Sequence, residues 1–341
     1  MIEQALKKIA ARQDLSREEM AKAMESIADG TATPAQIGAL LVGLRVKGET
    51  VEEILGAAQT MRARVDRVAV EAEVFVDTCG TGGDGRSTFN ISTAAAFVVA
   101  GAGVVVAKHG NRAVSSKCGS ADVLAALGVN VDASKAVVER CIARVGIGFL
   151  FAPRLHPAFK AAAAIRRELG LRTVFNLLGP LANPALARHQ VMGVFDPHWV
   201  PVLGKVLSAL GAKRAFVVHG DGLDEISTAG PTHVAEVKGE LVETYVISPE
   251  ALGLKRSRLE DLAGGDAAHN ARMIREVLSG KEGPAMDAVL ANAAAALVAG
   301  GAADSLRDGV DVARISIGSG AASRKLEQLA QLSSEPEAGP G

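Results

Sequence analysis

The sequence predicts an α/β fold in which a small helical domain precedes a large domain with a mainly parallel central sheet. Residues 1–70 carry only helix signals, whereas from about residue 74 short apolar runs alternate with helical patterns. Such apolar runs are typical of strands that are buried on both faces of a parallel sheet. The length of 341 residues suits two domains, or one large domain with a smaller partner.

Three capping-box sequences mark helix starts in the N-terminal segment. In this motif a Ser or Thr and a Glu or Gln three residues later satisfy free amides in the first turn of a helix. The pairs are Ser16 with Glu19, Thr33 with Gln36, and Thr50 with Glu53. Apolar residues recur at helical spacing at Ile37, Leu40, Leu41 and Leu44, and again at Ile54, Ala58 and Met61. We expect a helical domain without chemistry of its own, whose apolar composition also suits a dimer interface.

Strands and helices alternate along the rest of the chain. The expected strands are Val74–Asp77, Val104–Ala107, Val191–Val194 and Phe216–His219, followed by a weaker hairpin of Val234–Val237 and Leu241–Val246. The expected helices are Ser92–Ala102, Ser120–Leu127, Ala133–Val145, Pro157–Leu169 and Val200–Leu210. We expect residues 1–70, joined by helices from about 157–183, to form the helical domain, and residues 71–332 the α/β domain. The last segment, 333–341, is expected to be a disordered tail.

The composition excludes several classes of protein. Lys and Arg number 37 against 38 Asp and Glu, so the formal net charge is −1, and neither nucleic acid nor an anionic membrane is an expected partner. Aromatic residues make up only 3%, which argues against a base-stacking surface. No apolar run approaches the roughly 20 residues of a membrane span, and no signal peptide is recognisable at the N-terminus. The three cysteines lack metal-ligand spacing and are typical of reduced thiols, so we expect a cytoplasmic protein.

A glycine-rich loop follows the first expected strand. Four glycines between residues 80 and 85 separate the strand that ends at Asp77 from a helix that starts near Asn90. Glycines let backbone amides approach an anion, and a helix N-terminus adds a favourable dipole. The alternative is a tight turn, but the loop has more small polar residues than a turn requires, and it matches neither a Walker A loop nor a dinucleotide fingerprint. We expect phosphate binding, with a metal or a ligand hydroxyl or amine beside Asp84 to relieve charge repulsion.

A second polar loop follows the next expected strand. Residues 108–117 concentrate Lys, His, Asn, Arg and Ser side chains, which suits a ligand with two or more phosphate groups. For Arg112 or Lys117 taken singly, a solvated basic loop is an equally good explanation. Cys118 has no recognisable paired base, so we do not expect it to act as a nucleophile.

A third loop, after the strand that ends at His219, is acidic. Asp221, Asp224 and Glu225 supply hard oxygen ligands, and a phosphate-bound Mg²⁺ takes only one or two carboxylates from a protein. A solvated acidic turn is the alternative, but a phosphate site nearby favours the functional interpretation.

In combination, these segments resemble the anthranilate phosphoribosyltransferase family. The resemblance covers nearly the whole chain up to the tail and rests on DTCGTGGDG, NIST, KHGNRAVSSKCGSADVL, FNLLGPLANP, GDGLDE and VLANAAAAL in the family's order. It implies a nucleoside phosphorylase/phosphoribosyltransferase-like fold, a homodimer formed through the helical domain, and Mg²⁺ as cofactor. The implied reaction moves the 5-phosphoribosyl group from phosphoribosyl pyrophosphate to the amine of anthranilate, the second step of tryptophan biosynthesis. Two departures, Cys118 where Ser is also common and Met286 where a basic residue is expected, lie outside the expected chemistry.

The resemblance also implies three sets of site residues. Phosphoribosyl pyrophosphate would contact Gly80, Gly83, Asp84, Thr88, Asn90, Ile91, Ser92, Thr93, Lys108, His109, Gly110, Asn111, Arg112, Ala113, Val114, Ser115, Ser116 and Ser120. Anthranilate would contact Gly80, His109, Asn111 and Arg166, and Mg²⁺ would bind Ser92, Asp224 and Glu225. We expect positioning by Lys108 and His109 but no strong general base, because the aromatic amine needs orientation more than deprotonation.

Other functional classes predict different sequences. A pyrimidine nucleoside phosphorylase would share the architecture but is expected to carry a Lys-His-Ser-Thr-Gly-Gly loop. A non-catalytic nucleic-acid-binding relative would show a basic groove and an eroded phosphate loop, which the net charge of −1 and the intact KHGNR segment oppose. A purely structural protein would have no reason to place three polar, glycine-rich loops after strands.

Overall fold

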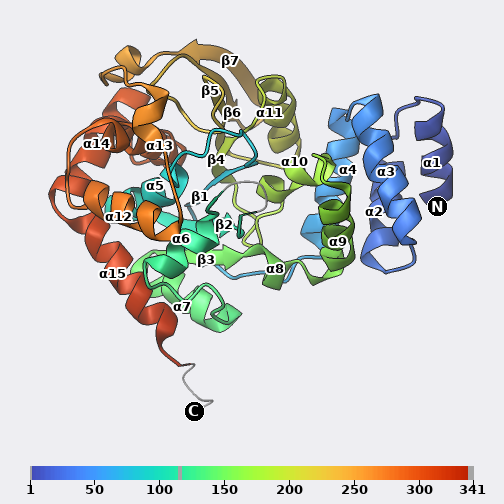
Figure 1. Ribbon diagram of the computed structural model, residues 1–341, viewed down its shortest axis with the longest axis horizontal. Coiled ribbons are helices and arrows are strands. Elements are labelled where there is room, and N and C mark those ends of the chain that lie inside the picture. The colour runs from blue at the N-terminus through green and yellow to red at the C-terminus, as the bar shows by residue number, and fades with distance from the viewer. Residues whose placement is uncertain (1, 114–116, 337–341) are drawn as a thin grey trace.

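The computed structural model describes residues 2–113 and 117–336 and consists of a helical part and a larger α/β part (Figure 1). The helical part begins with α1 (Ile2–Ala10), α2 (Arg17–Ala28), α3 (Pro34–Lys47) and α4 (Val51–Ala63). All three predicted capping boxes are present, and the Ser16, Thr33 and Thr50 hydroxyls accept bonds from backbone amides at 3.2, 3.2 and 3.3 Å. The predicted apolar stripe of α3 is buried against the neighbouring helices. Local sequence therefore determines where these helices begin.

A seven-stranded sheet with the order β3-β2-β1-β4-β5-β6-β7 forms the centre of the α/β part. The strands are β1 (Phe75–Gly80), β2 (Val105–Gly110), β3 (Ile147–Phe151), β4 (His189–Gly193), β5 (Arg214–Gly220), β6 (Thr232–Lys238) and β7 (Leu241–Ile247). β1 to β5 are parallel, and β6 and β7 form the predicted antiparallel hairpin at one edge. The structure adds β3, which the sequence did not predict. β3 almost directly follows the helix that ends at Val145, and its residues, apolar apart from Gly148, cannot be told from the end of a buried helix by periodicity.

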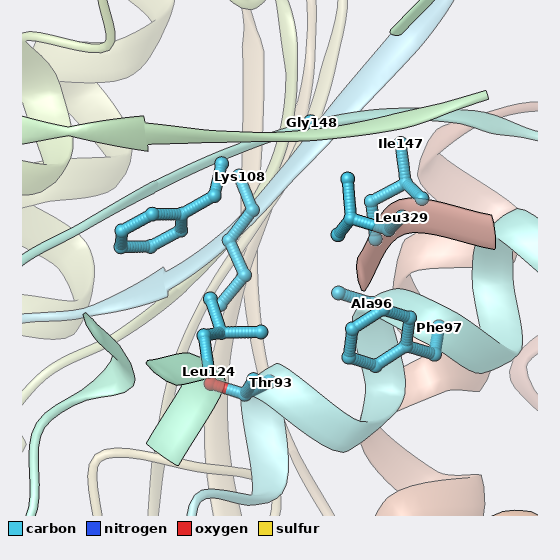
Figure 2. Close-up of a pocket in the computed structure, with 9 residues that line it drawn as sticks. Thr93, Ala96, Phe97, Lys108, Leu124, Ile147, Gly148 and Leu329 are labelled. Atoms are coloured by element: carbon cyan, nitrogen blue, oxygen red, sulfur yellow. The ribbon is translucent and has the colours of Figure 1, made fainter. Parts of the chain in front are cut away.

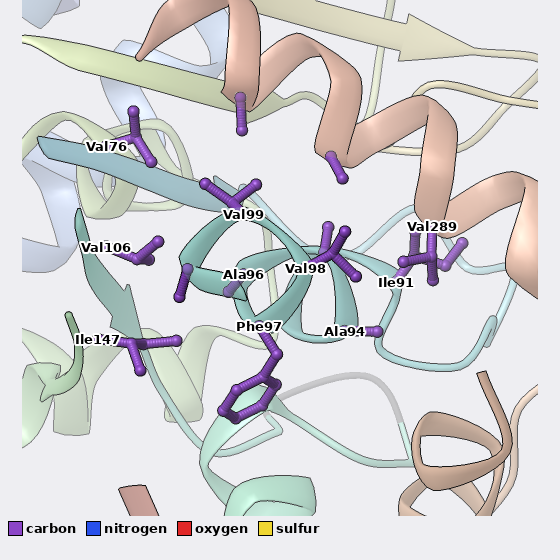
Figure 3. Close-up of a cluster of buried hydrophobic side chains, with 14 of the residues drawn as sticks. Val76, Ile91, Ala94, Ala96, Phe97, Val98, Val99, Val106, Ile147 and Val289 are labelled. Carbon is purple, nitrogen blue, oxygen red and sulfur yellow. The ribbon is translucent and has the colours of Figure 1, made fainter. Parts of the chain in front are cut away.

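Helices cover both faces of the sheet (Figure 1). One layer contains α5 (Ile91–Gly101), α6 (Ser120–Ala126), α7 (Lys135–Val145), α12 (Ala267–Leu278), α13 (Pro284–Ala299), α14 (Leu306–Gly318) and α15 (Ala321–Ser334), and α11 (Trp199–Ala209) packs on β5, β6 and β7. The 3₁₀ turns η2 (Pro249–Leu252) and η3 (Leu259–Leu262) lie between β7 and α12. Figure 3 shows the core around α5, where Val99 and Ala96 lie near the strand residues Val76 and Val106, and α13 contributes Val289. This rigid layer fixes the N-terminus of α5.

The segment after β3 packs against the helical part. It contains α8 (Ala152–Leu155), the 3₁₀ turn η1 (Pro157–Phe159), α9 (Lys160–Leu169) and α10 (Val174–Leu181). α9 contacts α3 and α10 contacts α4, and their apolar residues share one core with α1 to α4. At the other end of the chain, α15 runs to Ser334, two residues into the segment expected to be disordered, and the buried Ser333 hydroxyl accepts the Asn130 N–H at 3.0 Å. The rest of that expected tail, 337–341, lies outside the described residues.

The sheet topology decides where the three polar loops meet. The chain adds β2 and β3 on one side of β1 and then β4 and β5 on the other, so the switch in direction lies between β1 and β4. In open α/β sheets the carboxyl ends of the strands at such a switch form the binding crevice. β1, β2 and β5 end at Gly80, Gly110 and Gly220, which brings all three loops to this edge. Within the described residues, no helix is long and apolar enough to cross a membrane.

Candidate active site

The glycine-rich loop between β1 and α5 has a backbone that suits glycine. Gly82, Gly83 and Gly85 have φ angles of 64°, 78° and 76°, in the left-handed region where a side chain is disfavoured. The Gly82 N–H donates to the Oδ2 of Asp224 at 2.7 Å, which joins this loop to the acidic loop. Asp84 accepts the Arg86 N–H at 3.0 Å. The first of these bonds fixes the loop from outside, and the second closes a turn within it.

The acidic loop after β5 packs directly on the ends of β1 and β4. A Cβ atom at Gly193 would overlap the Asp224 carbonyl oxygen, and one at Gly80 would overlap its Oδ2. The Ser92 N–H, in the first turn of α5, donates to Glu225 Oε1 at 3.0 Å. The three residues predicted to bind Mg²⁺ are thus brought together. Asp221 does not join them, since it is exposed and packs against Gly230.

The carboxylates of Asp224 and Glu225 repel each other in a crowded site. Each residue keeps part of its surface open to solvent, but the surrounding protein desolvates its carboxylate. Burial, with the nearby Asp84 charge, raises the pKa of Asp224 to about 7, and burial with the Asp224 charge raises the pKa of Glu225 to about 8. A cation between these groups would offset both the repulsion between the carboxylates and the desolvation of their charges. The described residues contain no cluster of three or more His, Cys, Asp or Glu side chains that could hold a metal ion by themselves. Mg²⁺ needs only one or two carboxylates from a protein, because phosphate oxygens and water complete its shell.

Lys108 reaches the site from inside the sheet. Its stem lines an apolar pocket between β2, β3 and α5, which Thr93 lines from the helix side (Figure 2). The ammonium donates to the Thr78 carbonyl oxygen and lies 3.5 Å from the Ser92 hydroxyl. Burial lowers the pKa of Lys108, while the charges of Asp77 and Glu225 oppose that shift. The structure therefore places the Lys108 ammonium beneath the first turn of α5. The Thr93 side chain is buried in the same part of the interior.

His109 is held at the end of β2 by a buried polar network. Its N–H donates to Asp77 Oδ1 at 3.0 Å, and its Nδ1 lies 3.1 Å from the carbonyl oxygen of Gly179 in α10. Its Nε2 is buried without a hydrogen-bond partner among the described residues. Burial, with the nearby His156, lowers the pKa of His109 to about 3, so the ring is neutral at physiological pH. A neutral, oriented imidazole suits positioning rather than strong base catalysis.

The remainder of the second loop is only partly directed toward this site. Ser120 Oγ bonds to Asn111, 3.2 Å from both its N and its O, and a Cβ atom at Gly110 would overlap the same Oγ, so these three residues form one tight corner. Arg112 instead pairs with Asp122 at 3.2 Å. Its guanidinium also stacks over a phenylalanine ring of β3. Its expected phosphate contact is therefore not preformed, because acidic and aromatic neighbours from other elements hold the side chain.

The next residue of the second loop, like Arg112, is bonded to Asp122. The Ala113 N–H donates to Asp122 Oδ2 at 2.9 Å. Val114, Ser115 and Ser116 were expected to contact phosphate and lie outside the described residues.

Residues 88–91 link the glycine loop to the other loops. Thr88 pairs with Ala263 in an isolated bridge, and the Asn90 side chain donates to the Cys118 carbonyl oxygen at 3.1 Å. Ile91 has no exposed surface, so it anchors the start of α5 in the core. Cys118 shows no sign of activation, since burial raises its thiol pKa to about 11.

Arg166 approaches from α9, on the helical side of the site. Its guanidinium lies 5.4 Å from the centre of the Phe175 ring on α10, and its Nε is buried without a hydrogen-bond partner in the part of the chain that the structure describes. Burial lowers the pKa of Arg166. A desolvated guanidinium with a free donor is suited to a carboxylate ligand.

Comparison with known proteins finds relatives that match this chain over nearly its whole length. The family models that match are the helical bundle domain of a glycosyl transferase family, over residues 3–65, and its a/b domain, over residues 72–323. The anthranilate phosphoribosyltransferase of Anaeromyxobacter dehalogenans (strain 2CP-C) is 68% identical over 98% of this chain and 100% of its own length. The chain belongs to the anthranilate phosphoribosyltransferase family.

Solved structures of this anthranilate phosphoribosyltransferase family have the same fold. The enzyme from Thermus thermophilus superimposes with a TM-score of 0.92 at 44% identity and covers 97% of this chain and 99% of its own. The Saccharomyces cerevisiae enzyme in complex with PRPP (phosphoribosyl pyrophosphate) and Mg superimposes with a TM-score of 0.87 at 30% identity, covering 98% of both chains. The predicted architecture, a small helical domain and a mainly parallel α/β domain, is therefore confirmed.

Some residues at this site gave no signal in the sequence. The His156 ring lies 5.2 Å from the His109 ring, and burial lowers the pKa of His156 to about 4. Gln190 of β4 donates to the Pro180 carbonyl oxygen at 2.7 Å and thereby fixes α10 beside His109. A lone His or Gln in a helical or strand pattern is usually structural, so only their spatial neighbours reveal them.

Proposed function

We propose that the site at the carboxyl ends of β1, β2 and β5 binds magnesium phosphoribosyl pyrophosphate and anthranilate. The chain transfers the 5-phosphoribosyl group to the amine of anthranilate and releases pyrophosphate, as a pentosyltransferase of tryptophan biosynthesis. The observation that carries the assignment of the site is the junction of the glycine loop and the start of α5 with the acidic loop, in which the Gly82 and Ser92 amides donate to the carboxylates of Asp224 and Glu225. This junction combines anion-binding amides with cation-binding oxygens, which is what a metal-bound pyrophosphate requires.

The donor substrate would lie along the glycine loop and the first turn of α5. Backbone amides there, with the Thr88, Ser92 and Ser120 hydroxyls and the Asn90 side chain, supply donors for phosphate and ribose oxygens. The residues proposed to contact phosphoribosyl pyrophosphate are those expected from the sequence, namely Gly80, Gly83, Asp84, Thr88, Asn90, Ile91, Ser92, Thr93, Lys108, residues 109–116 and Ser120. Within it, the structure supports a backbone role for Ile91 and Thr93, because their side chains are buried.

The acceptor would lie between His109 and α9. Arg166 is placed to pair with the anthranilate carboxylate, and the Nε2 of His109 would accept a bond from the substrate or its amine. Gly80 and Asn111 would border the same space. The Saccharomyces cerevisiae relative has been solved in complex with 4-fluoroanthranilate, which supports an acceptor site of this chemistry here.

The geometry favours catalysis by orientation and leaving-group stabilisation. Loss of pyrophosphate creates positive charge at C1 of the ribose and negative charge on the leaving group. The glycine-loop amides and Lys108 stabilise that negative charge. Ser92, Asp224 and Glu225 would hold Mg²⁺, which would supply further positive charge to the leaving group. The anthranilate amine attacks C1 as the bond from C1 to the pyrophosphate oxygen breaks, without prior deprotonation, because burial lowers the pKa of His109 to about 3 and leaves it a weak base. The proton that the amine nitrogen then loses passes to the departing pyrophosphate or to solvent.

We further infer the assembly and cellular setting. The helical domain comprises residues 1–70 with helices from about 157–183, the α/β domain comprises 71–332, and two chains dimerise through the helical domain. The exposed Val46 on α3 supports that choice of surface. The enzyme acts in the cytoplasm on two small polar substrates. Sedimentation equilibrium of the purified chain tests the dimer, and a monomer at micromolar concentration would contradict it.

A fluorescence assay tests the reaction directly. Anthranilate fluorescence should fall only when phosphoribosyl pyrophosphate and Mg²⁺ are both present. Omitting either one, or chelating the metal with EDTA, should stop the decrease. Constant fluorescence in the complete mixture would contradict the proposal, and phosphate-dependent cleavage of a pyrimidine nucleoside would favour the phosphorylase alternative.

A further inference from the structure

Arg172 connects the segment after the acceptor helix to the glycine loop. It lies between α9 and α10 and is itself exposed, so it contributes little to the core. Its Nη2 donates to the Gly83 carbonyl oxygen, and its guanidinium lies 4.5 Å from the centre of the Phe195 ring. An exposed arginine that makes both a stacking contact and a directed hydrogen bond is held in one orientation.

Phe195 is tied to the same loop from the other side. Its N–H donates to the Thr81 hydroxyl at 3.1 Å, and the Thr81 N–H donates to the Gly193 carbonyl oxygen at 2.9 Å. The Phe195 ring, on which the Arg172 guanidinium stacks, is therefore held in place at the end of β4. Arg172 reaches from this ring to Gly83, two residues further along the loop, and clamps the part of the loop where φ is 78°.

Within the described residues, no carboxylate competes for the guanidinium. Across residues 2–113 and 117–336, Arg172 forms no ion pair, and its hydrogen-bond acceptor is the Gly83 carbonyl. A glycine-rich loop has high conformational entropy when it is free, so a contact that fixes it before the ligand arrives lowers the cost of binding.

We propose that Arg172 is a positioning residue that preorganises the glycine loop and couples it to the acceptor helix. This inference rests on the proposed function of the site. Arg166 and Arg172 lie on one continuous segment, with Arg166 directed to the acceptor and Arg172 to the donor loop. Arg172 lies just beyond Gly170, the residue that caps α9, so one short segment of the chain borders both proposed substrate sites.

The test compares three single variants and one double variant. Arg172→Ala removes the clamp, Arg172→Lys keeps the charge but loses the planar stack, and Phe195→Leu removes the base of the stack. Each variant should raise the KM for phosphoribosyl pyrophosphate about tenfold. The double variant, Arg172→Ala with Phe195→Leu, should raise this KM no more than either single variant, because both substitutions remove the same contact. Arg167→Ala, at an exposed position on α9, is the matched control and should behave like the wild type.

Hydrogen exchange supplies a readout that does not depend on turnover. Without ligand, amides of residues 80–88 should exchange faster in Arg172→Ala and Phe195→Leu than in the wild type and in Arg167→Ala. Unchanged exchange, or wild-type kinetics in Arg172→Ala, would overturn the proposal. The proposal would also fail if Arg172→Lys and Phe195→Leu both kept the wild-type KM for phosphoribosyl pyrophosphate while Arg172→Ala did not. That pattern would indicate a direct contact between the charge of residue 172 and a phosphate group.

Failure of this inference can be told from failure of the proposed function. The wild-type protein is assayed first for consumption of anthranilate with phosphoribosyl pyrophosphate and Mg²⁺. An inactive wild type contradicts the function, whereas an active wild type with unaffected variants contradicts only the role of Arg172.

Discussion

The Ser92 N–H donates to the Oε1 of Glu225 at 3.0 Å and so joins two loops that are 133 residues apart in the chain. Ser92 lies in the first turn of α5, where backbone amides lack partners within the helix. Glu225 therefore accepts a hydrogen bond from an amide that has no partner within the helix. The same bond holds Glu225 in place beside Asp224. The bond explains how a loop after β5 becomes part of a phosphate site that begins at β1.

Replacement of both acidic residues tests the metal site. Asp224→Asn with Glu225→Gln should lower turnover at least about 100-fold, because the pyrophosphate leaving group would lose its metal-bound stabilisation. A solvated acidic turn would have little effect on folding. The structure instead shows crowded carboxylates with raised pKa values, so the variant should unfold at the same or a higher temperature than the ligand-free wild type. Near-normal turnover at limiting Mg²⁺ would rule out the assignment.

The same carboxylates predict how stability depends on pH. Their pKa values of about 7 and about 8 in the folded state exceed the values near 4 of an unfolded chain. The folded protein then binds protons more tightly, so this contribution to stability is present at low pH and is lost as the pH rises through the folded values. The thermal midpoint of the ligand-free wild type should fall more between about pH 5 and pH 8 than that of the double variant, because in this range the folded state holds protons that the unfolded chain has lost. Parallel profiles for the two proteins would contradict this origin of the pH dependence.

Arg166→Ala tests the acceptor site. The variant should raise the KM for anthranilate much more than that for phosphoribosyl pyrophosphate, because the guanidinium pairs with a carboxylate found only on the acceptor. Steady-state kinetics with each substrate varied in turn measures both constants. Equal changes in the two constants would indicate a general disturbance, and Arg167→Ala, which should change neither, is the control.

Gly83→Ala separates a phosphate cradle from a simple turn. With φ at 78°, alanine strains the loop, so binding of the magnesium complex of phosphoribosyl pyrophosphate should weaken strongly, while unfolding costs only about 1 kcal/mol. Calorimetric titration measures the affinity, and wild-type affinity would leave only the turn interpretation.

Gly239→Ala is the control for that experiment. Its φ of 62° is similar, an added Cβ meets nothing within 4 Å, and the residue lies in the β6–β7 hairpin away from the site. It should match the stability loss of Gly83→Ala without affecting binding. Gly101 would be an unsuitable control, because a Cβ there would lie 2.6 Å from the Ala322 backbone nitrogen.

Local signals determined most of the elements and the place of the loops. The capping boxes at Ser16, Thr33 and Thr50, and the apolar runs of β1, β2, β4 and β5, depend on neighbours a few residues away, so they can be read from the chain directly. Polar glycine-rich segments after strands predict a site at one edge of the sheet, because parallel strands end on the same side.

The tertiary structure alone decided which of those polar residues face each other. It turns Arg112 toward Asp122, buries the Thr93 side chain, and places His156 beside His109 and Arg172 over Gly83. Such contacts follow from the order of strands in the sheet and from how α9 and α10 pack, which are set by the whole core and not by spacing along the chain. The sequence by itself therefore determined the chemistry available to this protein, whereas long-range packing decided how that chemistry is arranged.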